Sequence, residues 1–280
     1  MLTMLEIALA HPSDYPMSPS LPPADSGHAK DANRAYYDRR TQGQEDYWRL
    51  MAAPRFRVRM ALRAVAQARP ATICDFGCGN GALLGAVHAR FPHIQLMGLD
   101  LSSELIAENS KRLPYASFAA ADLCGETFAF PWEPVDMALS MEVIEHLDQP
   151  GLYLNSIYRA LAPGGTLFLS TQSGPIRATE QHVGHVRHWS REDIHEALAQ
   201  AGFSDISPRS TGWPFHDLSK YLANRNPDKT IRSFGESGYG FKQKAVCLAL
   251  RCLFLCNSRR CGLQLFAVAR KPLPGEDGQA

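Results

Sequence analysis

The stretch Thr72-Ile-Cys-Asp-Phe-Gly-Cys-Gly-Asn-Gly81 decides the fold of this chain. Its first half is a short apolar run of the kind that forms a buried strand. Gly77 and Gly79 follow at once, and because glycine lacks a Cβ they allow a tight turn and the close approach of a ligand. A helix is predicted from Gly81 to Phe91, so its free amides face the same point. Together these features predict a nucleotide-binding site at the edge of a parallel sheet.

Strands and helices continue to alternate along the chain. Ser102 is expected to cap one helix, with Leu105 and Ile106 on its buried side. Strands are predicted at residues 72–76, 94–99, 116–121, 135–141, 166–170, 203–207 and 262–269, and further helices at 81–91, 152–161 and 190–201. This spacing implies right-handed crossovers and therefore an α/β fold with a doubly wound, Rossmann-like, mostly parallel sheet of seven strands.

The composition is that of a globular protein with a sizeable core, because 45% of the 280 residues are hydrophobic and 20% are charged. The net charge of +1 argues neither for nor against nucleic acid. Its distribution is uneven: residues 34–69 and 220–260 are rich in Lys and Arg, whereas residues 95–148 are acidic. Such polarity predicts attraction of an anionic acceptor, and solvated helix faces are the alternative explanation.

The seven cysteines form no Cys-x-x-Cys pair, so free thiols and no structural zinc site are expected. Residues 1–10 carry no basic leader and do not resemble a signal peptide. No apolar run approaches the roughly 18 residues of a spanning helix. A cytoplasmic location and no transmembrane segment are therefore expected.

The glycine turn has two interpretations. The run from Gly77 to Ala82 also fits the dinucleotide fingerprint Gly-x-Gly-x-x-Gly/Ala, and Asp100 could accept ribose hydroxyls in either case. An NAD-dependent oxidoreductase is thus left open by this motif. Asp75 favours another ligand, because a carboxylate suits the amino end of a zwitterion and repels a pyrophosphate. Ala121-Asp122-Leu123 adds an acid at a strand end, which could accept an adenine amino group.

Two further motifs complete the set, Met141-Glu-Val-Ile-Glu-His-Leu147 and Leu161-Ala-Pro-Gly-Gly-Thr-Leu167. With these in order, residues 71–172 resemble the core of class I S-adenosylmethionine-dependent methyltransferases, in particular the ubiquinone-biosynthesis type. The resemblance implies that residues 263–269 form an antiparallel last strand and that S-adenosyl-L-methionine is the cofactor. It also implies a cofactor-binding set: Asp75, Phe76, Gly77, Cys78, Gly79, Asp100, Leu101, Asp122, Leu123, Met141 and Glu142.

Within that set the resemblance places Asp75 and the glycines at the methionine end of the cofactor and Asp100 on its ribose. Asp122 and Leu123 would lie beside the adenine, with Leu101 packing on the ring. Met141 and Glu142 would lie near the sulfonium.

Histidine is the default general base if the acceptor is a hydroxyl. His146 follows the fourth strand, and His182, His185 and His188 lie in the loop after the fifth. His146 and His185 are the predicted catalytic residues; ordinary packing of these side chains is the alternative.

A metal is not predicted, but one arrangement allows it. Glu142, Glu145 and His146 share one face of a helical turn, and with His185 they could bind Mg or Mn. This set resembles the small-RNA 3′-end 2′-O-methyltransferases. The same string also resembles metal-free methyltransferases.

The chain is expected to divide as follows: 1–33 a flexible tail, 34–70 an N-terminal helical lid with a break at Pro54, 71–212 the cofactor-binding core, 213–260 a helical insertion acting as a substrate cap, 261–271 the final strand of the core, and 272–280 a tail. The predicted function is methyl transfer to a small-molecule acceptor, at oxygen, with an anionic sugar or lipid-linked intermediate as a candidate. The alternatives are a metal-assisted RNA 2′-O-methyltransferase, an NAD-dependent oxidoreductase and a regulatory protein that only binds the cofactor. Neither DNA nor RNA is an expected partner.

Residues 245–256 form an apolar helix flanked by Lys and Arg. The preferred prediction is a packed helix over the sheet, and weak contact with a membrane surface is the alternative.

Overall fold

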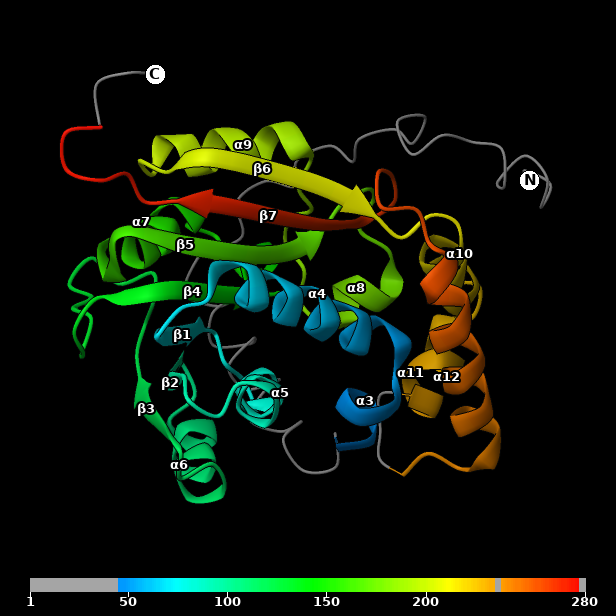
Figure 1. Cartoon of the computed structure of the whole chain (residues 1–280). Coiled ribbons are helices and arrows are strands. Elements are labelled where there is room, and N and C mark those ends of the chain that lie inside the picture. The colour runs from blue at the N-terminus through cyan, green and yellow to red at the C-terminus, as the bar shows by residue number, and fades with distance from the viewer. Residues whose placement is uncertain (1–44, 235–237, 277–280) are drawn as a thin grey trace.

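The computed structural model describes residues 45–234 and 238–276, which form a central sheet with helices on both faces (Figure 1). The seven strands are β1 (Thr72–Phe76), β2 (Gln95–Asp100), β3 (Ala116–Ala120), β4 (Val135–Met141), β5 (Leu161–Gln172), β6 (Ser204–Thr211) and β7 (Gln264–Arg270). Their order in the sheet is β3-β2-β1-β4-β5-β7-β6. Only β7 runs antiparallel to its neighbours. The predicted fold, with an antiparallel last strand, is confirmed.

Helices occupy the connections between the strands. Ser102 caps one of them as expected, its hydroxyl accepting the Leu105 amide, and Leu105 and Ile106 are buried. The helices are α3 (Glu45–Leu50), α4 (Ala52–Ala68), α5 (Ala82–Arg90), α6 (Ser103–Arg112), α7 (Pro150–Ala160), α8 (Ala178–His182), α9 (Arg191–Gln200), α10 (Phe215–Ala223), α11 (Pro227–Phe234) and α12 (Phe241–Leu253), with short 3-10 turns η2 (Ile144–His146) and η3 (Phe254–Cys256).

Side chains of the central strands alternate between two apolar cores. On one face Phe76 joins a cluster with Tyr153 of α7 and Ile194 of α9. On the other face Ile73 joins Val65 of α4 and other side chains of α4 and α5. Because both faces are covered, the strands are fixed and their carboxyl ends open together at one edge.

Three local predictions were wrong. The N-terminal helical region breaks at Met51, and Pro54 lies in the first turn of α4, where a missing amide costs no hydrogen bond. The fifth strand, expected at residues 166–170, begins at Leu161 and ends at Gln172. The run Pro163-Gly-Gly165 lies inside it as an irregularity, because Val135 pairs with Leu161 and the regular register resumes at Thr166. The loop after β5 contains the short helix α8. Residues 1–44, with part of the predicted lid, lie outside the described residues.

The predicted insertion lies between β6 and β7, and α10, α11 and α12 form a cap beside the carboxyl ends of the parallel strands (Figure 1). Its two ends meet at a neck: Thr211 pairs with Gln264, and the amides of Gly212 and Ser258 bond the carbonyls of Ser258 and Trp213. The prediction of a helix packed over the sheet was wrong for α12, which packs on α4, α3 and α10. Among the described helices, none combines the length and apolar character needed to span a bilayer.

Candidate active site

A cavity of about 1040 Å³ lies between the carboxyl ends of the strands and the cap. The strand-end half of its wall comes from the strand ends and the loops that follow them, and the cap half comes from α3, α4 and α8 together with α10, α11 and α12. Both predicted histidines, His146 and His185, line it. Phe76 of the predicted cofactor set is instead fully buried in the core. The other ten members line the cavity: Asp75, Gly77, Cys78, Gly79, Asp100, Leu101, Asp122, Leu123, Met141 and Glu142.

The glycine turn is shaped by two different constraints. Gly77 has φ +82°, and a Cβ there would lie 2.5 Å from a methyl group of Val143. Gly79 has φ +49°, but a Cβ there would meet no atom within 4 Å, because it would project into open space. Gly77 is therefore required by packing, whereas Gly79 leaves room for a ligand.

Asp75 is a buried carboxyl with an unsatisfied oxygen. It is 2% exposed, and its Oδ1 has no hydrogen-bond partner. Burial, followed by the negative charge of Asp100, raises the pKa of Asp75 to about 8. Because a buried polar atom without a partner is costly, this oxygen is poised to accept a donor or a cation from a ligand in the cavity.

Asp100 joins the ends of β1 and β2. Its two carboxylate oxygens accept the amides of Gly79 at 2.8 Å and Ser102 at 3.0 Å. Each oxygen keeps a second lone pair, so the group can also accept hydroxyls. Asp122, at the end of the next strand, accepts the Cys124 amide at 3.1 Å.

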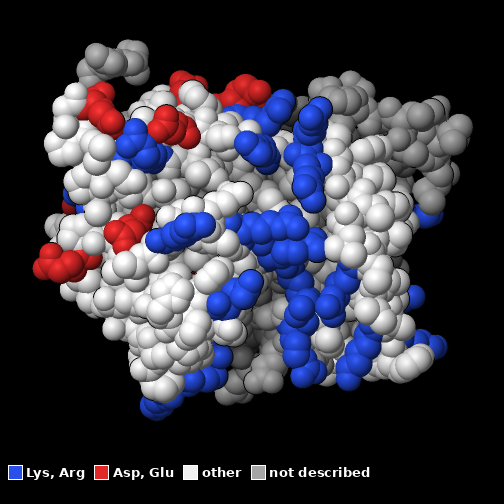
Figure 2. Space-filling view, in the orientation of Figure 1, with Lys and Arg blue, Asp and Glu red and all other residues white. Residues whose placement is uncertain are grey.

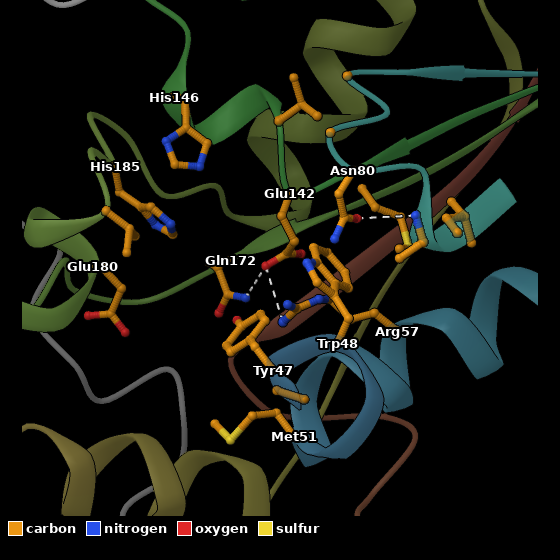
Figure 3. A pocket seen from close by; sticks show the side chains of 18 of the residues that line it. Tyr47, Trp48, Met51, Arg57, Asn80, Glu142, His146, Gln172, Glu180 and His185 are labelled. Carbon is orange, nitrogen blue, oxygen red and sulfur yellow. Dashed lines mark hydrogen bonds and ion pairs between the residues drawn. The ribbon is translucent and has the colours of Figure 1, made fainter. Parts of the chain in front are cut away.

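Glu142 lies at the junction of the two halves, with a positive φ of 56° (Figure 3). Arg57 of α4 forms an ion pair with it at 3.4 Å, Ser170 and Gln264 donate at 2.9 and 3.0 Å, and the Gln172 amide also donates. Burial acts to raise the pKa of Glu142, but Arg57 and the three neutral donors outweigh it and lower the pKa. Glu142 is therefore a charged, fully bonded group.

The histidines form a directional chain of hydrogen bonds. His188 Nδ1 contacts the Gly174 carbonyl at 2.9 Å, and a carbonyl only accepts, so this nitrogen carries the proton. Burial lowers the pKa of His188 to about 4, so the ring is neutral and its Nε2 accepts from His185 Nδ1 at 2.9 Å. Burial also lowers the pKa of His185, which leaves its Nε2 unprotonated.

His146 has the same tautomer by the same argument. Its Nδ1 lies 3.1 Å from the Gly184 carbonyl, and burial lowers its pKa. Its ring meets that of His185 edge to face, with centroids 4.7 Å apart. Both rings lie in the wall of the cavity (Figure 3), and in this tautomer the proton of each ring is on Nδ1.

A family model described as a methyltransferase domain matches residues 46–207, more than half of the chain. The chain belongs to the methyltransferase-domain family. Trans-aconitate 2-methyltransferase of Acidovorax sp. (strain JS42) is 36% identical over 171 residues, which are 59% of this chain and 61% of that protein. The match to a second such relative, from Methylobacterium nodulans, covers 40% of its length. The chain therefore spans about half of the curated relatives that it matches.

Solved structures support the methyltransferase fold. The N-methyltransferase NodS from Bradyrhizobium japonicum WM9, in complex with S-adenosyl-L-homocysteine, aligns with a TM-score of 0.54 at 20% identity, over 86% of this chain and 98% of NodS. The [4+2]-cyclase SpnF aligns with a TM-score of 0.50 at 21% identity, over 77% of this chain and 82% of SpnF. Since two different activities share this fold, the fold alone does not decide the reaction.

Family membership confirms the predicted resemblance to class I methyltransferases and argues against the oxidoreductase interpretation. The site also contains residues that the sequence analysis did not identify, namely Arg57, Gln172, Lys220 and Gln264. Gln172 ends β5 as Asp100 ends β2. The rule that places polar side chains at strand ends in the site would therefore have placed Gln172 there as well. Arg57 lies on the buried face of α4 with Ala61 and Val65, which follow four and eight residues later. This helical spacing in the sequence could have indicated that Arg57 is buried.

Lys220 extends the polar network of the site into the cap. Its ammonium donates to Gln172 at 2.7 Å and pairs with Glu180 at 3.1 Å. Among the described residues that line the cavity, two carry a Lys or Arg side chain, Arg57 and Lys220. Each of them already has an acidic partner. The rest of the cap's contribution is mainly apolar: Leu222, Ala223, Ile231, Phe234, Val246, Cys247 and Leu250.

Three of the four possible metal ligands come together. The ligand atoms of Glu145, His146 and His185 all lie within 4.8 Å of one another. Glu145 is fully buried; one oxygen accepts the Thr171 hydroxyl at 2.9 Å, and the other has no partner. Burial and the charge of Glu142 raise its pKa. Glu142 is held by Arg57 and lies outside this group.

Proposed function

We propose that the protein transfers the methyl group of S-adenosyl-L-methionine to an oxygen atom of a small-molecule acceptor. The observation that carries this proposal is the continuity of the cavity. The wall of one cavity contains both the unsatisfied carboxyl of Asp75 and the imidazole rings of His146 and His185. A cationic cofactor and an acceptor hydroxyl can therefore occupy one connected space.

The strand ends supply the groups that would hold the cofactor. Asp75 would accept its amino group, and Asp100 its ribose hydroxyls. Asp122 and Leu123 would flank the adenine, with Leu101 on the ring face. Met141 would lie near the sulfonium, together with Glu142. The open space beside Gly79 is the room that such a ligand requires.

The cofactor supplies an electrophilic methyl group when bound, so the protein has to position the acceptor and remove its proton. A hydroxyl proton can pass to the Nε2 of His185 or His146, because both imidazoles are neutral and their Nδ1 protons are already engaged. His188 would hold His185 in the required tautomer. The apolar wall of the cap would exclude water.

The cap favours an amphipathic acceptor over a polyanion. Its wall is mainly apolar, and both described cations of the cavity are already paired. Trans-aconitate, named for the relatives, is a polycarboxylate with no apolar body. The acceptor proposed here carries one hydroxyl on an apolar body, of which a lipid-linked intermediate is an example.

Two measurements test this proposal. Calorimetric titration should show micromolar binding of S-adenosyl-L-methionine and none of NAD, and binding of NAD alone would overturn it. Incubation with methyl-labelled cofactor and the lipid and aqueous fractions of a cell extract should label an alkali-stable lipid-phase product. Asp100→Ala should abolish the labelling. Cofactor binding with no labelled product in any fraction would favour the regulatory protein instead.

A second candidate is metal-assisted methyl transfer, including transfer to an RNA 2′-hydroxyl. It is favoured by the cluster of Glu145, His146 and His185 with an unpartnered carboxyl oxygen. Activity lost in EDTA and restored by Mg or Mn would support it, and activity indifferent to EDTA would remove it. Glu145→Gln should then abolish metal dependence, while His195→Ala, on the exposed face of α9, serves as a control.

A further inference from the structure

The cap carries an exposed apolar stripe on α12 and η3. Phe241, Ala245, Leu248, Cys252 and Leu255 recur at alternating intervals of four and three residues, and all are exposed. Phe241 is 88% exposed, Leu248 59% and Leu255 65%. We call these five residues the α12 stripe.

The opposite side of α12 and η3 packs against the rest of the protein. Cys247 and Phe254 are buried, and the Phe254 ring meets the Phe56 ring of α4 edge to face at 6.4 Å. The stripe is therefore not needed to hold the helix in place. Of the nine large hydrophobic side chains exposed in the described part of the chain, five lie in α12 and η3, which makes a concentrated patch rather than scattered exposure: Phe241, Val246, Leu248, Leu253 and Leu255.

The surroundings of the stripe are strongly basic. From Gly238 to Ala269 the sequence contains five Lys and Arg residues and no Asp or Glu. The arginines of α4 adjoin this segment: burial and Arg251 lower the pKa of Arg55, and burial, Arg63 and Arg259 lower that of Arg59. Figure 2 shows Lys and Arg side chains gathered in a band over α4 and beside α12.

A small hollow at the end of this band is lined by arginines. Its volume is about 430 Å³, and Arg191, Arg209, Arg259 and Arg260 line it together with Pro208 and Ser210. Within the described residues none of these four arginines has an acidic partner. Four unpaired guanidinium groups around one hollow suit a phosphate group.

We propose that the α12 stripe and its flanking Lys and Arg side chains bind the surface of an anionic lipid bilayer. The stripe would enter the boundary between headgroups and acyl chains, and the basic side chains would contact lipid phosphates. The charge decides the occupant, because a neutral apolar partner would gain nothing from a band of cations without acids. Both signals required for stable interfacial binding, apolar area and positive charge, occur on one face.

This surface adjoins the cavity. Val246 and Leu222 are 47% and 46% exposed, and both also line the cavity wall. If the cap docked on a bilayer, the apolar side of the cavity wall would therefore face the lipid. The step from docking to delivery of a lipid-borne acceptor rests on the proposed function; the docking itself does not.

The test uses the full-length protein and two kinds of vesicle, phosphatidylcholine alone and phosphatidylcholine mixed with phosphatidylglycerol. Cosedimentation is expected with the anionic vesicles and should fall with added salt. Leu248→Asp should lower the partition coefficient about tenfold, from the loss of one buried leucine. Arg259→Glu with Arg260→Glu should lower it at least about 25-fold, at about fivefold for each basic residue.

Matched controls lie away from the surface. Leu273→Asp places a carboxylate at a similarly exposed leucine (45%) beyond β7, at the opposite end of the sheet from α12 (Figure 1). Lys111→Glu reverses a charge on α6. Both should sediment like the unaltered protein, and every variant should bind S-adenosyl-L-methionine equally, which reports folding.

Three results would overturn the proposal: no sedimentation with anionic vesicles, equal sedimentation with both vesicle types, or no effect of either stripe or arginine variants. If Leu248→Asp instead converts a dimer into a monomer by light scattering, the stripe is an interface between copies of the chain. Vesicle binding without cofactor binding would leave this proposal standing and refute the proposed function.

Discussion

The two halves of the cavity are built in different ways. The strand-end half takes its polar groups from the ends of neighbouring parallel strands, and these groups bond backbone amides, as Asp100 does with Gly79 and Ser102. The cap half depends on side chains far apart in sequence, such as Lys220 with Gln172 and Arg57 with Glu142. Backbone geometry at the strand ends therefore determines the strand-end half, and side-chain contacts between separate elements determine the cap half.

The largest expected effect comes from breaking the junction of the two halves. Glu142→Gln leaves the buried guanidinium of Arg57 without a counter-charge, so the free energy of unfolding should fall by about 3–5 kcal/mol. Urea denaturation measures this. Asp205→Asn is the control, because it removes a partner of the solvent-exposed Arg270 and should change stability little. Equal stability of Glu142→Gln and the unaltered protein would mean that the junction is not structural.

The second-largest effect is expected at Asp100. A control at the other end of the same strand separates the loss of ligand contacts from the loss of hydrogen bonds that support the sheet. Asp100→Ala should weaken S-adenosyl-L-methionine binding about 100-fold, because two hydrogen bonds to a charged group are lost. Asp136→Ala is the matched control: this carboxylate also accepts two amides, of Ala71 and Thr72 at 2.9 Å, but at the opposite end of β1. Calorimetry should find its affinity unchanged. A similar loss in both variants would assign the effect to the sheet and not to the ligand.

A third prediction concerns pH. The pKa of Asp75 is about 8 in the folded protein and about 3.9 when unfolded, so between these values the folded state holds a proton that the unfolded chain releases. This group therefore makes stability fall as pH rises from about 4 to about 8, by at most about 1.4 kcal/mol per pH unit, and adds no slope above pH 8. Urea unfolding of the ligand-free protein between pH 5 and 9 should show a shallower decline for Asp75→Asn. Parallel curves would refute a buried, protonated Asp75.

The smallest effect is expected in the histidine cluster. His188→Ala removes the acceptor that holds His185 in one tautomer, so kcat should fall about fivefold with KM unchanged. The pH profile of kcat should also shift, which loss of packing alone would not produce. His195→Ala on α9 should behave like the unaltered protein. A change in KM alone would assign His188 to acceptor binding.

The same division explains what the sequence could predict. The alternation of strands and helices along the chain, the Ser102 cap and the placement of Asp75, Gly77 and Asp100 follow from short-range rules, because each depends on residues near it in the sequence. The hydrogen-bond chain through His185 and His188 could be suspected from their spacing alone. Its direction could not, because the acceptor that sets it is the carbonyl of Gly174, outside the histidine cluster.

Hydrogen bonds between side chains far apart in the sequence could not be predicted from local sequence patterns. Gln172 and Gln264 meet across 92 residues of sequence, and nothing local marks either as a donor to Glu142. The prediction for α12 was wrong for a related reason: its apolar residues were expected to face the sheet. The helix has two apolar sides, and only the tertiary structure shows which one is covered.

The neck of the cap has a consequence for how such a protein can change over time. Because Thr211 and Gln264 are paired neighbours in the sheet, the whole cap leaves and rejoins the core at one place. A cap of different length would cost nearly the same entropy to close, because the entropic cost of closing a loop rises slowly with its length. The register of β6 and β7 would be kept, and so would the strand-end half. On the proposed function, the acceptor range would therefore be encoded by one contiguous piece of gene, which could be exchanged or lengthened while the strand ends stay unchanged.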